Sequence, residues 1–389
     1  MAVRKRAATM LAAMLSLSNA GFANVGFAGV AVAEPLGLPP VPIPPDNPQS
    51  SDKIALGNRL FHDLRFSSDG AVACATCHKD DHAFTDSPLR TSEGIRASDG
   101  IGKKTGTRNA PTIINSAYFT TLFWDGRSAS LEDQSQHPFL NPVEMGLATH
   151  EPILAIARTD PFYVELFKKA FGKTGDGVTM EEVKKAIAAY ERTIVSADSP
   201  FDHWRFGHQE NAISEAAKRG FEVFVGQGRC VSCHVIEQDQ ALFTDNRFHN
   251  IGVGINRAQF DVPRLSAEFL TAKAKGADVD KAVLTDPKTS ELGRFAVTDQ
   301  FDVIGAFKTP TLRNVAVTAP YMHDGSLRTL KDVVKHYNNG GRSEGDPAQV
   351  NDYLSGGIRP LNLTEQQMDD LVAFMETLTT PAYFGAKTR

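Results

Sequence analysis

Hydrophobic residues recur at helical spacing in two stretches that each precede a pair of cysteines. In the first stretch they are Ile54, Gly57, Leu60 and Phe61. In the second they are Ile213, Ala217, Gly220, Phe221 and Phe224. Intervals of three and four residues put each set on one face of an α-helix, so the pattern predicts two helices. Each face includes a glycine, which lets the backbone of another helix approach closely.

Two further helices are indicated by capping boxes, in which a threonine is followed three residues later by Glu or Gln. Thr179 and Glu182 precede the apolar residues Val183, Ile187, Tyr190 and Ile194. Thr364 and Gln367 precede the apolar residues Met368, Leu371, Val372, Met375 and Leu378. We interpret these stripes as the core-facing sides of helices. Because strand-like alternation is scarce, the predicted fold class is mostly α.

The first 33 residues have the pattern of a secretory signal peptide. Basic residues at 4–6 are followed by an apolar stretch over 7–17, and small residues lead to Ala-Val-Ala at 31–33. Cleavage after Ala20 or Ala23 is the alternative. The apolar stretch is too short to cross about 30 Å of hydrocarbon, which argues against a membrane anchor. We therefore expect an exported, periplasmic protein with no membrane span in the mature chain.

The composition limits the partners of the mature chain. The 389 residues are 41% hydrophobic and 22% charged, as in a globular protein long enough for two domains. The formal net charge is −5, and removing residues 1–33 takes away three positive charges and no negative ones, which gives −8. This balance argues against nucleic acid as a partner, because nucleic-acid binding requires a basic face.

All four cysteines belong to two complete C-x-x-C-H motifs. The first runs from Cys74 and Cys77 to His78, and the second from Cys230 and Cys233 to His234. This motif attaches a c-type haem, because two thiols one helical turn apart reach the two vinyl groups of the haem. The histidine that follows places an imidazole nitrogen on the iron.

A Cys₄ zinc site and two redox-active C-x-x-C pairs are the alternatives for these cysteines. Neither alternative requires a histidine after each pair. The sequence therefore predicts two covalently bound haem c groups as cofactors.

Each motif is preceded and followed by one of the predicted helices, which is the plan of a small c-type cytochrome repeated twice. We therefore expect two c-type cytochrome-like haem domains in tandem. The predicted division is a signal peptide at 1–33, a Pro-rich extended leader at 34–50, an N-terminal haem domain at 51–200 and a C-terminal haem domain at 201–389.

Proteins with two c-type haems fall into two functional classes. An electron carrier gives both irons two strong protein ligands, whereas a peroxidase leaves one iron open and places an acid–base group above it. The C-x-x-C-H motifs occur in both classes, so the choice between an electron carrier and a peroxidase depends on residues outside these motifs.

Over roughly residues 50 to 380, the chain resembles the bacterial di-haem cytochrome c peroxidases, and within them the MauG branch. The founding member of that branch completes a tryptophan-derived quinone cofactor in methylamine dehydrogenase. The segments that carry the resemblance are Gly106–Thr112, Phe123–Arg127, Asn141–Met145, Gly293–Phe295 and Pro310–Gly325.

The resemblance implies that the haem on His78 is the peroxidatic one. It matches Glu144 to a distal acid that helps break the O–O bond of H₂O₂ by proton transfer. It also matches Gln134 and Pro138 to positions that line the peroxide pocket. From the residue type alone, Glu144 would be interpreted as a solvated surface carboxylate.

The resemblance also assigns roles around the second haem. Trp124 matches the residue that lies between the two haems and relays oxidising equivalents, although a buried core aromatic is the simpler interpretation. The haem on His234 is expected to transfer electrons. Tyr337 stands fourteen residues after His323, where typical peroxidases have a methionine ligand and the MauG branch has tyrosine. A packing role for Tyr337, or Met322 as the ligand, remains open.

Two further features follow from the resemblance. Many di-haem peroxidases have a loop histidine sixteen residues after the first motif, which blocks the iron until the other haem is reduced. Here that residue is Gly94, and the one histidine of the loop is His82. A calcium ion is also implied, with Asn109 as a side-chain ligand and Thr318 and Pro320 as carbonyl ligands.

These features together predict a periplasmic haem peroxidase or oxidoreductase that reduces H₂O₂ at a five-coordinate haem. Its electrons are expected from a protein, either a small cytochrome or cupredoxin, or a precursor enzyme whose aromatic residues are oxidised. The chain lacks an insertion that MauG carries before Phe123, so its substrate is left open. A non-catalytic di-haem electron-transfer cytochrome is the alternative.

Overall fold

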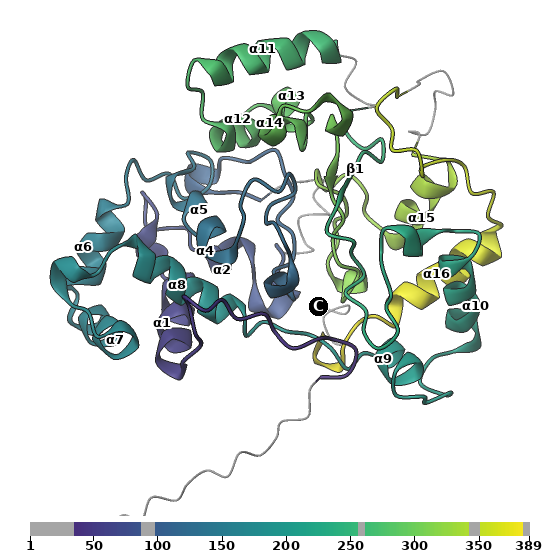
Figure 1. Cartoon of the computed structure of the whole chain (residues 1–389), viewed down its shortest axis with the longest axis horizontal. Coiled ribbons are helices and arrows are strands. Elements are labelled where there is room, and N and C mark those ends of the chain that lie inside the picture. Colours follow the sequence, from purple (N-terminus) through teal and green to yellow (C-terminus); the bar gives the residue numbers. More distant parts are fainter. Residues whose placement is uncertain (1–34, 87–97, 256–260, 342–350, 384–389) are drawn as a thin grey trace, which may run out of the picture. The chain divides into compact units, whose positions relative to one another are not determined.

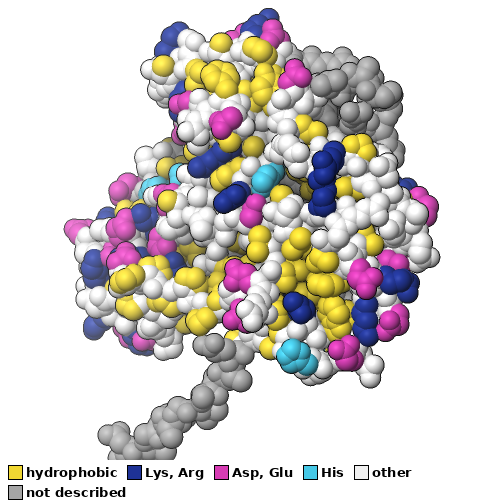
Figure 2. Space-filling model, turned by 45° about the vertical axis from the view of Figure 1, so that its right-hand side comes forward, with side chains coloured by type: hydrophobic (Ala, Val, Ile, Leu, Met, Phe, Trp, Pro, Cys, Tyr) yellow, Lys and Arg dark blue, Asp and Glu magenta, His cyan; other side chains and the backbone are white. Residues whose placement is uncertain are grey.

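The computed structural model of the chain describes residues 35–86, 98–255, 261–341 and 351–383 (Figure 1). The predicted signal peptide at 1–33 and the loop position Gly94 lie outside these residues. No helix in the described part has both the length and the hydropathy that a membrane crossing requires. On the face seen in Figure 2, hydrophobic side chains gather between groups of charged side chains of mixed sign.

The fold is mostly helical, as predicted. The helices before residue 200 are α1 (Ser51–His62), α2 (Cys74–Cys77), α4 (Leu131–Gln134), α5 (His137–Leu140), α6 (Glu151–Thr159), α7 (Pro161–Phe171) and α8 (Met180–Glu191). Those from residue 200 onward are α9 (Pro200–Arg205), α10 (Glu215–Val225), α11 (Val262–Ala274), α12 (Val279–Thr285), α13 (Pro287–Ser290), α14 (Phe295–Thr298), α15 (Leu330–Asn338) and α16 (Glu365–Glu376).

Strand structure is confined, in the described residues, to one short antiparallel pair. Strand β1 (Phe248–His249) pairs with β2 (Phe307–Lys308), with Phe248 opposite Lys308. Short 3₁₀ turns make up much of the rest, and the second C-x-x-C-H motif begins in one of them, Cys230–Ser232.

Two helix pairs form the cores of the two halves. Helix α1 packs on α8, and α10 packs on α16. Gly57 lies against the backbone of Ala186 and Gly220 against the backbone of Asp370, so closely that a Cβ atom at either glycine would collide with the facing carbonyl. The four predicted helices are therefore confirmed, together with the close approach at each glycine. Both capping boxes are also formed, with Thr179 capping α8 and Thr364 capping α16.

A third group of helices was not predicted from the sequence. Helices α11 to α14 lie together at the top of Figure 1 and surround a separate apolar cluster that includes Phe269, Leu292 and Phe295. This group belongs to neither helix pair. Its residues matter for the site because Asp280 of α12 extends to the peroxidase-like motifs of the first half.

The two halves repeat one local motif. Pro111-Thr112 and Pro310-Thr311 are followed at the same distance by Asn115 and Asn314, which both adopt a left-handed conformation. The Thr112 hydroxyl donates to the Ala83 carbonyl, and the Thr311 hydroxyl donates to the Leu242 carbonyl. A turn closed by backbone pairing follows in each half, Leu122 with Ser128 and Tyr321 with Leu327.

The Pro-rich leader packs on both halves without forming a helix or a strand of its own. Gly37 pairs with Gln240 and accepts a hydrogen bond from the Arg313 guanidinium at 2.7 Å. The Asn47 side chain is buried and donates to Glu132 at 2.7 Å. The leader therefore contacts both sequence halves.

Breaking the Arg313 pair is expected to destabilise the fold. Arg313 is 1% exposed and binds both carboxylate oxygens of Asp202, at 2.8 and 3.0 Å. Arg313→Leu leaves that carboxylate buried without its cation, so urea denaturation should show a loss of about 3–5 kcal/mol. Arg264→Leu, which removes an exposed ion pair with Glu268, should change stability by less than about 0.5 kcal/mol. Equal losses in the two variants would contradict this assignment.

Candidate haem and peroxide site

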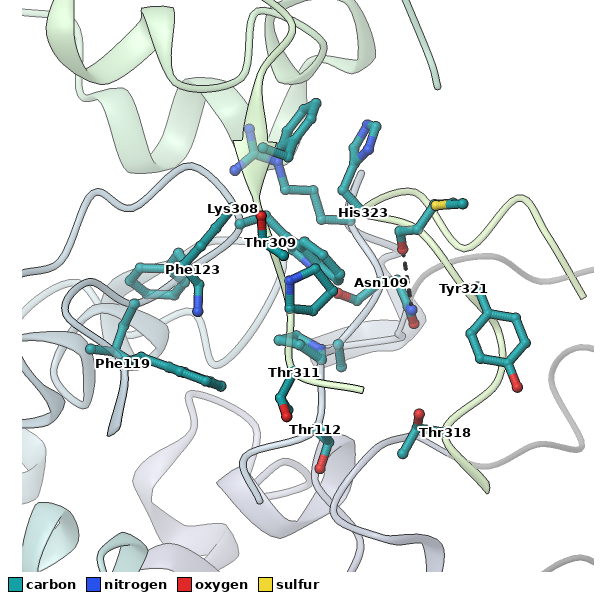
Figure 3. A pocket seen from close by; sticks show the side chains of 18 of the residues that line it. Asn109, Thr112, Phe119, Phe123, Lys308, Thr309, Thr311, Thr318, Tyr321 and His323 are labelled. Atoms are coloured by element: carbon teal, nitrogen blue, oxygen red, sulfur yellow. Dashed lines mark hydrogen bonds between the residues drawn. The ribbon is translucent and has the colours of Figure 1, made fainter. Parts of the chain in front are cut away.

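One cavity of about 720 Å³ is lined by both C-x-x-C-H motifs. Its wall includes Cys74, Cys77, His78, Cys230, Cys233 and His234. Figure 3 shows part of this wall, where residues from both halves face each other. The cavity therefore brings together the two attachment sites that the sequence predicts.

The first motif is arranged for a haem iron. Its cysteines lie on the single-turn helix α2, and His78 follows as the residue that ends the helix. The Nδ1 atom of His78 lies 3.1 Å from the Phe84 carbonyl oxygen, so Nδ1–H donates and Nε2 is left for a metal. Burial lowers the pKa of His78, which keeps the imidazole neutral, as metal ligation requires.

The second motif repeats this arrangement. The Nδ1 atom of His234 lies 2.9 Å from the Phe243 carbonyl oxygen, which again leaves Nε2 as the free ring nitrogen. Phe84 and Phe243 both have a positive φ, of 55° and 52°. Two partly buried histidines with the same tautomer, each beside a cysteine pair on one cavity, fit two haem groups.

Glu144 lies on the wall of the same cavity as His78. Its Oε2 atom is buried and has no hydrogen-bond partner within the described residues. Burial and the nearby Asp280 carboxylate raise the pKa of Glu144 to about 7, whereas Arg127 opposes this shift. Asn141 accepts the Glu144 backbone N–H and donates its amide to Asp280 at 2.8 Å, which holds the loop in place.

Gln134, Pro138 and Trp124 also line the cavity. Gln134 ends α4 and Pro138 lies in the first turn of α5. The Trp124 indole N–H donates to the Asn109 carbonyl at 2.8 Å, and the Trp124 carbonyl accepts the backbone N–H of Lys308 at 2.8 Å. Trp124 is thus fixed by contacts with both halves of the chain.

Tyr337 lines the cavity from α15, close to the cysteines of the second motif. Burial raises the pKa of its phenol, so an unliganded Tyr337 keeps its proton. Met322, the alternative ligand, lines the cavity too. His82 is not among the lining residues, and its ring lies 3.8 Å from Asp81.

Of the three residues matched to a calcium site, Asn109 and Pro320 are in direct contact. The Asn109 amide nitrogen donates to the Pro320 carbonyl at 2.8 Å and to the Met322 carbonyl at 3.4 Å, the second drawn in Figure 3. Thr318 lines the same cavity. A calcium ion takes oxygen ligands only, so the Asn109 amide would have to present its oxygen instead. The set fits calcium only with that rotation.

Several charged residues of the cavity wall were not singled out from the sequence, among them Arg127, Glu191 and Lys308. The Oε2 atom of Glu191 and the Nη2 atom of Arg127 are buried and unpartnered in the described part of the chain. Burial raises the pKa of Glu191 to about 8 and lowers that of Lys308 to about 7. One signal was available for Glu191, because it follows Ile187 by four residues and so lies on the apolar stripe of α8.

The comparison with known proteins decides the family. Residues 51–210 match the family model of di-haem cytochrome c peroxidase, and residues 217–379 match that of cytochrome c. The methylamine utilization protein MauG of Methylorubrum extorquens is 36% identical over 332 residues, which cover 85% of this chain and 79% of that protein. The chain belongs to the di-haem cytochrome c peroxidase family that includes MauG.

Other members of this di-haem peroxidase family also match the chain over most of its length. A cytochrome-c peroxidase of Denitromonas iodatirespirans is 38% identical over 86% of this chain and 83% of its own. A solved MauG-like protein associated with microbial copper homeostasis matches with a TM-score of 0.71 and 32% identity over 90% of this chain and 96% of its own. The di-haem peroxidase BthA from Burkholderia thailandensis matches with a TM-score of 0.68 and 26% identity over 87% of this chain and 88% of its own. The protein is thus a haem peroxidase with two haem c domains in tandem.

Glu191 is expected to make the stability of this di-haem peroxidase depend on pH. An ordinary glutamate ionises near pH 4.5, whereas Glu191 in the folded protein holds its proton up to about pH 8. The stability that this proton contributes is complete below the lower pH and is lost as the pH rises through the higher one. The loss amounts to at most roughly 5 kcal/mol. Glu191→Gln should lose less stability than wild type on going from acidic to alkaline pH, as measured by urea denaturation. Glu181→Gln, exposed on the same helix, should follow wild type, and parallel curves for all three proteins would contradict the shift.

Proposed function

We propose that the protein is a periplasmic peroxidase that reduces H₂O₂ at the haem on His78 with electrons from a protein. The observation that carries the proposal is the buried, unpartnered carboxyl oxygen of Glu144 on the cavity that His78 also lines. A carboxyl group in such a position costs free energy unless a ligand uses it. Family membership supports peroxide as that ligand.

The haem, when bound, supplies an iron with an open coordination position and exchanges electrons. Glu144 supplies the proton transfer. With a pKa of about 7, its carboxylate takes the proton from the near oxygen of peroxide and returns it to the leaving oxygen as water forms. Gln134 and Pro138 line the space beside it and exclude bulk water from the proton transfer.

Trp124 is proposed to carry oxidising equivalents between the two haems. Its indole N–H is bound to Asn109 and its carbonyl to Lys308, so the ring cannot leave the cavity wall. A residue held by both halves keeps a constant geometry, which electron transfer over a long distance requires. Tyr337 is proposed as the second ligand of the iron on His234. Leu330, Val333 and Tyr337 of α15 all line the cavity, and of these Tyr337 carries an oxygen that can bind a metal and lies close to the cysteines of that motif.

The electron source is proposed to be an exported protein. A tyrosinate ligand disfavours the reduced iron that storage of an electron from a carrier requires. This favours oxidation of aromatic residues in a partner protein, as in the MauG branch, over simple detoxification with a small cytochrome or cupredoxin. Asn109, Thr318 and Pro320 are proposed to hold calcium once the Asn109 amide has turned its oxygen inward.

The test is stopped-flow mixing of the as-isolated ferric protein with H₂O₂, without added reductant. We expect a rapid change in the Soret absorption, because Gly94 replaces the histidine that closes the iron in peroxidases requiring activation. Absence of any change before or after partial reduction would overturn the proposal and favour the electron-transfer cytochrome. A change only after reduction would contradict the proposed open resting state.

A further inference from the structure

Lys308 is a buried cation that lacks an acidic partner among the described residues. It is 7% exposed, and its ammonium lies 3.5 Å from the centre of the Phe119 ring. Figure 3 shows Lys308 on the same side of the cavity as Phe119 and Phe123. A ring face offsets only a small part of the cost of burying a full charge. An anion is therefore missing from the immediate surroundings of Lys308.

The other buried charges nearby balance each other. Arg108 and Arg127 both bind Asp125, at 2.6 and 3.0 Å, and Arg127 also binds Asp280 at 2.7 Å. Two cations and two anions cancel, so the charge of Lys308 remains in excess. Arg127 still has one donor to spare, because its Nη2 atom is buried and unpartnered within the described residues. Its guanidinium carbon stacks 3.5 Å from the centre of the Phe123 ring.

The repeated motif explains why Lys308 reaches the first half. Lys308 precedes Pro310-Thr311 by the same interval as Asn109 precedes Pro111-Thr112. The backbone N–H of Asn109 donates to the His323 carbonyl, and that of Lys308 donates to the Trp124 carbonyl, both at 2.8 Å. Trp124 and His323 occupy equivalent places in the two backbone-paired turns. The two halves therefore make equivalent contacts with each other: Asn109 of the first half contacts the second half, and Lys308 of the second half contacts the first.

The environment of the Lys308 ammonium belongs to the first haem domain. Phe119 packs with Leu122, Leu131 of α4 and Ala188 of α8. Phe123 stacks edge-on with His137 of α5, one residue before Pro138. These elements form the wall on which Gln134 lies. A haem attached at His78 would bring two propionate carboxylates into this cavity, and such a carboxylate has the charge that Lys308 lacks in a partner.

We propose that Lys308, together with the Nη2 donor of Arg127, binds a propionate of the haem on His78. The second half of the chain thereby supplies the counter-ion of the first haem. Lys308 is a positioning residue: it fixes the haem edge next to Trp124, to whose carbonyl its own backbone is bonded. The inference rests on haem attachment and does not depend on the peroxide chemistry proposed above.

The test compares Lys308→Met and Lys308→Arg with Lys169→Met, each as the two-haem ferric protein without peroxide. Lys169 is exposed on α7 and paired only with Glu165 in the described structure, so its replacement removes the same charge far from the cavity. Lys308→Met should lower one of the two midpoint potentials, because an uncompensated propionate stabilises the ferric iron. The propionate bending band in the resonance Raman spectrum should shift in the same variant. Lys308→Arg should restore both, and Lys169→Met should leave both unchanged.

The inference is overturned if Lys308→Met carries two haems and shows the potentials and the propionate band of wild type. Should that variant fail to acquire its haems, a crystal structure of the wild-type haem protein decides. A propionate oxygen of the His78 haem within about 3 Å of the Lys308 ammonium supports the inference. An ammonium bound to the other haem, or to no propionate, overturns it. None of these outcomes involves peroxide, so they are separate from a failure of the proposed function.

Discussion

Replacing Glu144 by glutamine should slow the reaction of the ferric protein with H₂O₂ by roughly 10²–10⁴-fold, the range for loss of a general acid–base group. Glutamine keeps the shape of the side chain but cannot take a proton from peroxide. The measurement is the second-order rate of the Soret change in stopped-flow. Glu191→Gln is the matched control, because Glu191 is the other buried carboxyl with an unpartnered oxygen on this cavity.

The pH dependence provides an independent check on the same residue. Proton abstraction requires the carboxylate form, so the wild-type rate should fall as pH drops through about 7, the pKa of Glu144. The Glu144→Gln rate should stay level across that range. A variant that reacts as fast as wild type, or that keeps the same pH profile, would show that another group performs the proton transfer.

Replacing Tyr337 by methionine should raise the midpoint potential of the haem on His234 by on the order of 0.1 V or more, given the span that axial ligands set. A thioether stabilises reduced iron, whereas a phenolate stabilises oxidised iron. Spectroelectrochemical titration measures the change, and the low-spin absorption should shift with it. After this variant reacts with peroxide, the two oxidising equivalents should be shared less evenly between the two haems than in wild type.

The matched control for this variant is Tyr321→Phe. Tyr321 lines the same cavity, but its hydroxyl donates to the Val315 carbonyl at 2.9 Å, so it is not available as a ligand. Its replacement should leave both potentials near those of wild type. Unchanged potentials and an unchanged low-spin spectrum in Tyr337→Met would make Met322 the residue to test next.

Much of the fold was predictable because it depends on local signals. The helices α1, α8, α10 and α16 follow from apolar spacing and capping boxes, and each glycine on those faces marks a real close approach. The haem-attachment residues follow from a motif whose chemistry is fixed by the length of one helical turn. The helices α11 to α14 were missed because neither a C-x-x-C-H motif nor a Thr-x-x-Glu/Gln capping box marks that stretch.

The site was predictable only in part. Glu144, Gln134, Pro138 and Trp124 came from the resemblance, and the structure brings them to one cavity with His78. Their roles remain predictions. Lys308 and Arg127 were missed because their importance depends on which charges remain unpaired after folding. That balance is set by Asp125 and Asp280, residues far apart in the chain, and by a contact between the two halves that no sequence spacing reveals.

This di-haem peroxidase carries two haem c groups, and we propose that one of their irons is open to peroxide. The most direct test is the low-temperature EPR spectrum of the oxidised, as-isolated protein, with the haem content checked by mass spectrometry. We predict one high-spin ferric haem beside one low-spin ferric haem, in equal amounts. Two low-spin haems, both six-coordinate in every redox state, would contradict the account and identify the protein as an electron carrier.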